Sequence, residues 1–266
     1  MYRSIFIKII IAFIIVNSQL LTLNSEDKPY LRINTKMHTA KISRISVDNA
    51  GKYLLSCSRD KTAILWDAET GAYIKTFRIP IGDEKEGMLF SCAISPDGRY
   101  AVMGGWTSKD GLNNNLYIFN TNTGEMVKRI SGFPDAIIDI EFSMDGNYLA
   151  ASLKGGEGVY IIQTGDWSVY KKLTGYGTNS YNSSFGKTGN LATVYYDGKA
   201  RLYDSNFNLV KEITTTGGKE PFDVAFSPDG SKIAVGFTDS NKVRVFNGKT
   251  LALLYETDNT GIPTNE

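Results

Sequence analysis

A turn motif that ends in glycine recurs five times along the 266-residue chain. The five copies are VDNAG at 47–51, ISPDG at 94–98, FSMDG at 142–146, FGKTG at 185–189 and FSPDG at 226–230. Successive glycines are 41 to 48 residues apart, which is room for about four short strands and their turns. A chain with this period is expected to fold as similar units that cover one another's apolar faces.

The residues after each glycine have the pattern of short strands. A brief apolar strand comes first, as at 53–55 and 233–235, and an alternating strand follows after a polar turn. This later strand ends on a large apolar residue and a polar one, in the pairs Trp66-Asp67, Phe119-Asn120, Ile162-Gln163, Tyr203-Asp204 and Phe246-Asn247. A further strand comes next, for example at 73–79. Period-2 patterning between polar turns predicts a four-stranded antiparallel meander in each repeat.

The spacing, the SPDG turns and the segment SRDKTAILWD at 58–67 resemble WD40 repeats over about residues 30–257. The resemblance implies an all-β propeller of four-stranded antiparallel blades, five of them in this chain. WD40 relatives usually have seven blades, so either five blades close with a redundant strand at 30–34, or the ring is incomplete. The second alternative is favoured, because the tail at 258–266 is too short for three further strands.

In the first repeat, the resemblance places a buried hydrogen-bonded tetrad at His38, Ser58, Asp60 and Trp66. The other four repeats lack both the histidine and the tryptophan, so their interiors must be satisfied differently or be apolar. Ser, His and Asp together have the composition of a hydrolytic triad, but no substrate reaches a network between strands. We therefore expect a structural role for the tetrad and assign no catalytic residue.

The innermost strand of each repeat carries a polar residue three positions before its apolar anchor. These residues are Arg44, Ser91, Asp139, Asn182 and Asp223. Period-2 alternation puts them on one face, opposite the residues that directly follow them. If these strands line a central channel, the five residues form a polar tier at its mouth that is able to hold a small ligand or a partner's side chain. The alternative is a solvated channel lining.

A long polar insertion, GGWTSKDGLNNN at 104–115, replaces a short turn in the second repeat. With the connection at 175–182, it predicts a partner-binding surface that contains Trp106, Tyr176 and Tyr181. The alternative for Trp106 is that it folds back as an anchor of its own loop.

The N-terminus resembles an export signal. Arg3 and Lys8 precede an apolar run at 9–16 that is too short to span a bilayer. This predicts a signal peptide at 1–25, cleaved after Ser18 or Ser25, with an uncleaved anchor as the alternative. The mature protein is then expected to be secreted or periplasmic, without a stable membrane span. Export would permit a disulfide between Cys57 and Cys92, although two buried free thiols are favoured.

Composition excludes several function classes. The 29 basic and 28 acidic residues nearly cancel, which removes the electrostatic basis for nucleic-acid binding. With one histidine there is no multi-histidine metal site, and no phosphate-binding loop is complete, so neither a metal nor a cofactor is expected. The sequence predicts a noncatalytic scaffold that binds another protein. Alternatives are a lactonase- or hydrolase-type propeller enzyme that uses channel carboxylates, and a carbohydrate-binding propeller. Partner identity and self-association stay open.

Overall fold

The computed structural model describes residues 35–177 and 180–257. The chain divides into two units, residues 1–34 and residues 35–266, and all described residues lie in the second. The predicted signal peptide at 1–25, the strand at 30–34 and the tail at 258–266 lie outside the described residues.

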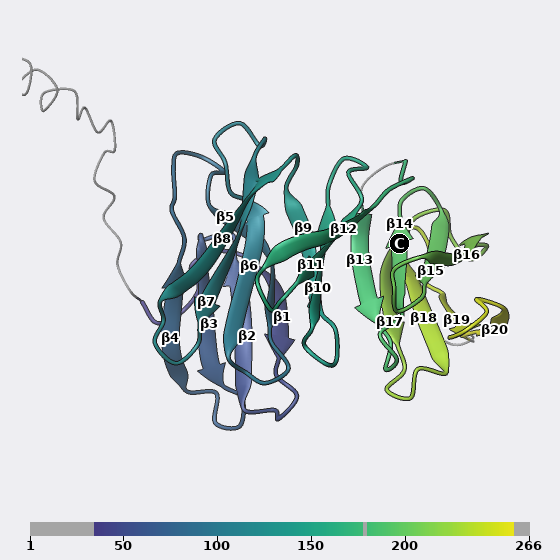
Figure 1. The fold of residues 1–266 in the computed structure, drawn as a ribbon, viewed down its shortest axis with the longest axis horizontal. Coiled ribbons are helices and arrows are strands. Elements are labelled where there is room, and N and C mark those ends of the chain that lie inside the picture. Colours follow the sequence, from purple (N-terminus) through teal and green to yellow (C-terminus); the bar gives the residue numbers. More distant parts are fainter. Residues whose placement is uncertain (1–34, 178–179, 258–266) are drawn as a thin grey trace, which may run out of the picture. The chain divides into compact units, whose positions relative to one another are not determined.

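In the described residues, twenty β-strands form five antiparallel sheets of four strands each, in chain order (Figure 1). The first sheet holds β1 (Ile42–Val47), β2 (Tyr53–Ser58), β3 (Thr62–Asp67) and β4 (Tyr73–Arg78), and the second β5 (Met88–Ile94), β6 (Tyr100–Trp106), β7 (Asn114–Asn120) and β8 (Met126–Phe133). The third holds β9 (Ile137–Phe142), β10 (Tyr148–Leu153), β11 (Val159–Gln163) and β12 (Ser168–Leu173). The fourth holds β13 (Ser180–Phe185), β14 (Leu191–Tyr195), β15 (Lys199–Tyr203) and β16 (Leu209–Thr214), and the fifth β17 (Pro221–Phe226), β18 (Lys232–Phe237), β19 (Val243–Asn247) and β20 (Leu253–Glu256). These sheets confirm the predicted all-β propeller blades.

The recurring glycine ends the turn between the first two strands of each sheet. In the second sheet, Gly98 has a φ of 72°, a left-handed conformation that favours glycine. The hydroxyl of Ser95 donates a hydrogen bond to Asp97 at 2.6 Å and accepts one from the Tyr100 N–H at 2.9 Å. The same side-chain contacts recur at Ser143 and Ser227, so the motif builds one turn geometry in three sheets.

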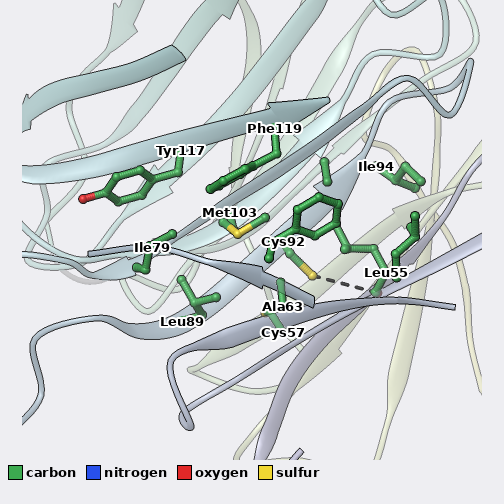
Figure 2. Close-up of a cluster of buried hydrophobic side chains, with 13 residues drawn as sticks. Leu55, Cys57, Ala63, Ile79, Leu89, Cys92, Ile94, Met103, Tyr117 and Phe119 are labelled. Carbon is green, nitrogen blue, oxygen red and sulfur yellow. Dashed lines mark hydrogen bonds between the residues drawn. The ribbon is translucent and has the colours of Figure 1, made fainter. Parts of the chain in front are cut away.

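Four buried apolar clusters hold consecutive sheets together. The cluster between the first two sheets includes Leu55, Phe77, Met103 and Tyr117 (Figure 2). Equivalent clusters join the second sheet to the third, the third to the fourth, and the fourth to the fifth. Each sheet is therefore stabilised mainly by its neighbours, as expected for radial repeats.

Within the described residues, the two end sheets each keep one apolar face uncovered. On β1 in the first sheet, Ile45 is 64% exposed and Val47 is 51% exposed. On β20 in the fifth sheet, Tyr255 is 48% exposed. No buried cluster within the described residues joins the first sheet to the fifth, so these five blades do not close on one another. Of the two arrangements considered from the sequence, the described residues adopt the unclosed one.

Candidate functional site

A hydrogen-bonded network in the first blade ties the segment before β1 to β2 and β3. His38 Nδ1 lies 2.9 Å from Asp60 Oδ2, and His38 Nε2 lies 2.8 Å from Ser56 Oγ. Trp66 Nε1 donates to the same serine oxygen at 2.8 Å. The side chains of His38 and Asp60 are only 4% and 7% exposed. The network is satisfied internally, which supports the structural role expected for it.

The hydroxyl in this network belongs to Ser56, whereas the sequence analysis placed Ser58 there. Ser58 is two residues further along β2, and its hydroxyl instead donates to the Ala40 carbonyl at 3.1 Å and accepts from the Asp60 N–H at 3.1 Å. Both serines lie on the same face of the strand because side chains alternate with period 2. The Trp66 indole N–H reaches Ser56. The alternating pattern of the strand does not show which of the two serines lies within reach of the indole.

The fourth blade builds an equivalent network from different residues. Tyr176 stands 13 residues before its turn glycine, as His38 does before Gly51. Its hydroxyl lies 2.6 Å from the Tyr203 hydroxyl and 3.3 Å from Thr193 Oγ1, so Thr193 and Tyr203 take the places of Ser56 and Trp66. This blade therefore keeps a polar interior without histidine or tryptophan.

A buried arginine completes the fourth-blade network. Arg201 is 2% exposed, and its guanidinium pairs with Asp197 at 2.6 Å and with Glu212 at 2.8 Å. The guanidinium carbon also lies 4.4 Å from the centroid of the Tyr176 ring, a cation–π distance. Asp197 occupies the turn position that Asp60 has in the first blade. In the third blade the matching interior is apolar, with Phe133, Ala151 and Ile162 in its cluster.

The five polar residues predicted for the channel mouth differ in burial. Ser91, Asp139 and Asn182 are buried, Arg44 is partly buried and Asp223 is exposed. Arg44 and Asp139 approach to 3.5 Å although they come from the first and third sheets. Asp139 Oδ2 also accepts hydrogen bonds from the N–H and the hydroxyl of Ser183 at 2.9 and 3.0 Å. The structure thus brings Arg44 and Asp139 together across the innermost strands.

Side chains two residues further along these strands satisfy the backbone of the next sheet. Ser46 Oγ accepts from the Ile94 N–H at 3.1 Å, Glu141 Oε1 from the Phe185 N–H at 3.0 Å, and Ser184 Oγ from the Phe226 N–H at 3.1 Å. Each acceptor stands five residues before its turn glycine. These side chains thus supply hydrogen-bond acceptors to backbone N–H groups on the unpaired edges of the innermost strands. None of these three acceptors was predicted from the sequence. Their constant spacing of five residues before the turn glycine is the sequence pattern that could have identified them.

Residues of the innermost strands line a cleft of about 350 Å³. Its polar walls include Arg44, Ser46, Asp139, Glu141 and Asn182. Burial raises the pKa of Asp139 despite the neighbouring Arg44 and the hydrogen bonds from Ser183. Burial also raises the pKa of Glu141 well above its usual range, against the hydrogen bond from Phe185, and the charge of Asp139 adds to the rise. The inner-strand cleft is able to hold a cationic or hydrogen-bonding group of a ligand.

We expect Glu141→Gln to raise the free energy of unfolding at pH 7 by about 1 kcal/mol. The amide oxygen retains the acceptor for the Phe185 N–H, and the substitution removes a charge that burial disfavours. Because the folded pKa lies above the unfolded one, the wild type gains stability as the pH falls between these values. Urea unfolding from pH 8 to 4 should show the two proteins converging in acid. The control is Glu157→Gln, at an exposed position. If Glu141→Gln is less stable than wild type at pH 7, the prediction is wrong.

The loop that carries Trp106 is rigid and internally bonded. The Thr107 N–H donates to Asn114 Oδ1 at 2.8 Å, and the Asn115 N–H donates to Thr107 Oγ1 at 2.6 Å. The Trp106 ring lies so close to Gly111 that a Cβ there would collide with it. Trp106 is therefore a loop anchor, as in the alternative considered from the sequence. The tip residue Leu112 is 57% exposed and is the better candidate for a partner contact.

The predicted surface of Trp106, Tyr176 and Tyr181 is not assembled by the structure. Tyr176 is 7% exposed and stacks on Tyr195 in the cluster between the third and fourth sheets, so it is not available to a partner. Its burial follows from its place in the fourth-blade network. Tyr181 lies in β13, and its side chain is outside the described residues.

Two features are absent from the residues that the structure describes. In the part of the chain that the structure describes, no three His, Cys, Asp or Glu side chains are grouped to hold a metal ion. Across the same residues, no helix has the length and apolarity needed to cross a membrane.

Comparison with known families identifies the repeats. Residues 31–67 and 210–247 match the model of the WD40 family, described as WD domain, G-beta repeat. These two segments are therefore similar to WD40 repeats. The second match begins in β16 and ends with β19, so a WD40 sequence repeat joins the outer strand of one blade to three strands of the next.

The chain is also similar to several proteins whose names describe different processes. The chain is 26% identical over 233 residues to Pre-mRNA-processing factor 19 of Oryza sativa subsp. japonica, covering 84% of this chain and 41% of that protein. It is 25% identical over 252 residues to Eukaryotic translation initiation factor 3 subunit I of Saccharomyces cerevisiae, covering 85% and 69%. It is 31% identical over 122 residues to the yeast Guanine nucleotide-binding protein subunit beta, covering 44% and 26%. The chain thus spans less than half of the first and third relatives.

Proposed function

We propose that this chain is a noncatalytic WD40 scaffold that acts outside the cytoplasm and binds a protein partner. One observation carries the proposal: ionisable side chains from the first and third sheets, Arg44, Asp139 and Glu141, meet in a single cleft on the innermost strands. The polar groups inside the first and fourth blades are instead bonded to one another. Repeat folds of this kind offer rigid surfaces for partners, which favours a binding role.

The loop at 107–113 supplies a second contact in this proposal. Hydrogen bonds of Thr107, Asn114 and Asn115 join the backbone and side chains of this loop. Leu112 is therefore presented on an ordered loop, and binding does not cost the conformational entropy of ordering it. The ammonium groups of Lys85 and Lys154 lie 5.5 and 6.0 Å from the Trp106 ring centroid. A partner with an apolar pocket and acidic rim fits this surface.

Affinity capture with the full chain as bait tests the binding role. The prey is the secreted and periplasmic protein fraction of the source cells. We expect Leu112→Asp and Arg44→Ala each to lower recovery of the captured partner at least about tenfold, and Leu112→Asp to keep a melting temperature close to wild type. Val210→Asp is the matched control, since Val210 is 55% exposed on β16, away from the cleft lining and the loop. Equal recovery by all four proteins refutes the proposed surface.

Export is tested separately, because it rests on residues outside the described part of the chain. Residues 1–25 fused to a reporter enzyme that is active only after export should give activity, and Ile11→Arg in the apolar run should abolish it. N-terminal sequencing of the exported chain should start after Ser18 or Ser25. A reporter that stays inactive contradicts the export part of the proposal and leaves the binding test unaffected.

The raised pKa values of Asp139 and Glu141 favour a propeller hydrolase as the second candidate, because a protonated carboxyl is able to act as a general acid. A panel of lactones and esters, with Asp139→Asn as the control, separates the two functions. Turnover by the wild type that is lost in Asp139→Asn would support the hydrolase function and contradict the noncatalytic scaffold. Binding without turnover supports the scaffold.

A further inference from the structure

The two cysteines of the chain meet at the contact between the first and second blades. Cys57 lies on β2 and Cys92 on β5, and their exposed fractions are 0% and 3%. Both belong to the buried cluster that includes Leu55, Ala63 and Met103 (Figure 2), and both are free thiols in this structure.

The thiol of Cys92 crosses from the second sheet to the first. Its Sγ lies 3.7 Å from the Arg44 carbonyl oxygen and 3.9 Å from the Leu55 carbonyl oxygen. Burial raises the pKa of this thiol, and a hydrogen bond with the Cys57 thiol contributes to the rise. Facing sheets usually lie about 10 Å apart, whereas a disulfide needs Cα atoms within about 7 Å. A short side chain that reaches the opposite backbone shows that β2 and β5 approach more closely than facing sheets usually do.

We propose that Cys57 and Cys92 form a disulfide that joins the first blade to the second when the chain folds under oxidising conditions. One thiolate attacks a low-molecular-weight disulfide, such as oxidised glutathione, and releases one glutathione thiolate. The second thiolate then attacks the cysteine sulfur of the mixed disulfide and releases the other glutathione. The two cysteines lose two protons and two electrons in total, and oxidised glutathione is reduced to two thiols.

The bond forms during folding, before the interface closes. In the folded chain both thiols are excluded from solvent, and an uncharged buried thiol attacks slowly. The link would enclose the 34 residues between the cysteines and would restrict the unfolded chain. It would act where support is weakest, because the first blade packs against only one neighbour within the described residues.

The test is refolding of the full chain from denaturant with and without a mixture of oxidised and reduced glutathione. The oxidised product should have the mass of the chain less two hydrogen atoms, and proteolysis without reductant should yield one linked peptide pair containing Cys57 and Cys92. Its melting temperature should exceed that of the reduced protein by about 5–10 °C. Cys92→Ala should give neither the link nor the oxidant-dependent shift.

Other outcomes overturn the proposal. These are two free thiols in a natively folded oxidised sample, a disulfide between two chains, or a linked protein that melts below the reduced one. If refolding fails, the full chain is instead produced in an oxidising cellular compartment and alkylated in denaturant. Two alkylated cysteines in that sample reject the disulfide, and none, with the linked peptide pair present, supports it. The result does not depend on the proposed binding function.

Discussion

Replacing Asp197 by alanine is expected to lower the free energy of unfolding by about 3 kcal/mol. The substitution removes the closer of two carboxylates from Arg201, whose side chain is 2% exposed and whose guanidinium lies over the Tyr176 ring. Glu212 remains as a partner at 2.8 Å, but it is 32% exposed and cannot replace a buried hydrogen-bonding oxygen. Breaking a buried pair costs more than a surface pair contributes, because a charge is left in an apolar setting.

Urea unfolding at pH 7 measures this loss, with Lys199→Ala as the matched control. Lys199 binds Glu212 in the same network, but both side chains are more than 30% exposed, so its loss should cost under about 0.5 kcal/mol. If Asp197→Ala and Lys199→Ala are equally stable, Arg201 does not depend on Asp197. Adding Arg201→Met to Asp197→Ala should restore part of the stability, since the unpaired charge is then gone.

Replacing Asp60 by alanine is expected to cost about 2 kcal/mol at pH 7 and to flatten the loss of stability in acid. Burial by itself raises the pKa of Asp60, but hydrogen bonds from His38, Thr62 and the Thr39 N–H outweigh it and hold the pKa at about 2. The unfolded value is about 3.9, so this contribution is complete above pH 4 and is lost as the pH falls towards 2. Solvent screens part of this interaction, so about 1 kcal/mol of the Asp60 contribution to the free energy of unfolding should depend on pH.

Unfolding curves of wild type and Asp60→Ala at pH 7, 4 and 2.5 check the second expectation. The two proteins should differ most at pH 7 and approach each other at the lowest pH. Asp67→Ala is the control, because the Asp67 carboxylate accepts hydrogen bonds from Thr70 in its own turn and is not part of the tetrad. A constant difference across this pH range would mean that the carboxylate does not titrate with folding.

The candidate site divides into residues that periodicity predicts and residues that it does not. The spacing from each turn glycine placed Arg44 and Asp139 on the same face of the innermost strands of their sheets, and the structure brings them to 3.5 Å. The same spacing could not separate Ser56 from Ser58, because the two share a face. Nor could it show that Tyr176 points into the fourth blade, since an aromatic residue in a connection is compatible with either an exposed or a buried side chain.

The sequence by itself determined the repeat, the strand order within each blade and the position of every turn glycine, because these depend on local alternation and on backbone conformations near one residue. Only the tertiary structure decided which side chains fill each blade interior, that β2 and β5 bring Cys57 and Cys92 together, and that both end faces stay uncovered within the described residues. Those features depend on contacts between residues far apart in the chain, where a side chain's reach and a neighbouring sheet's distance determine the partner, and neither quantity is encoded in a local pattern.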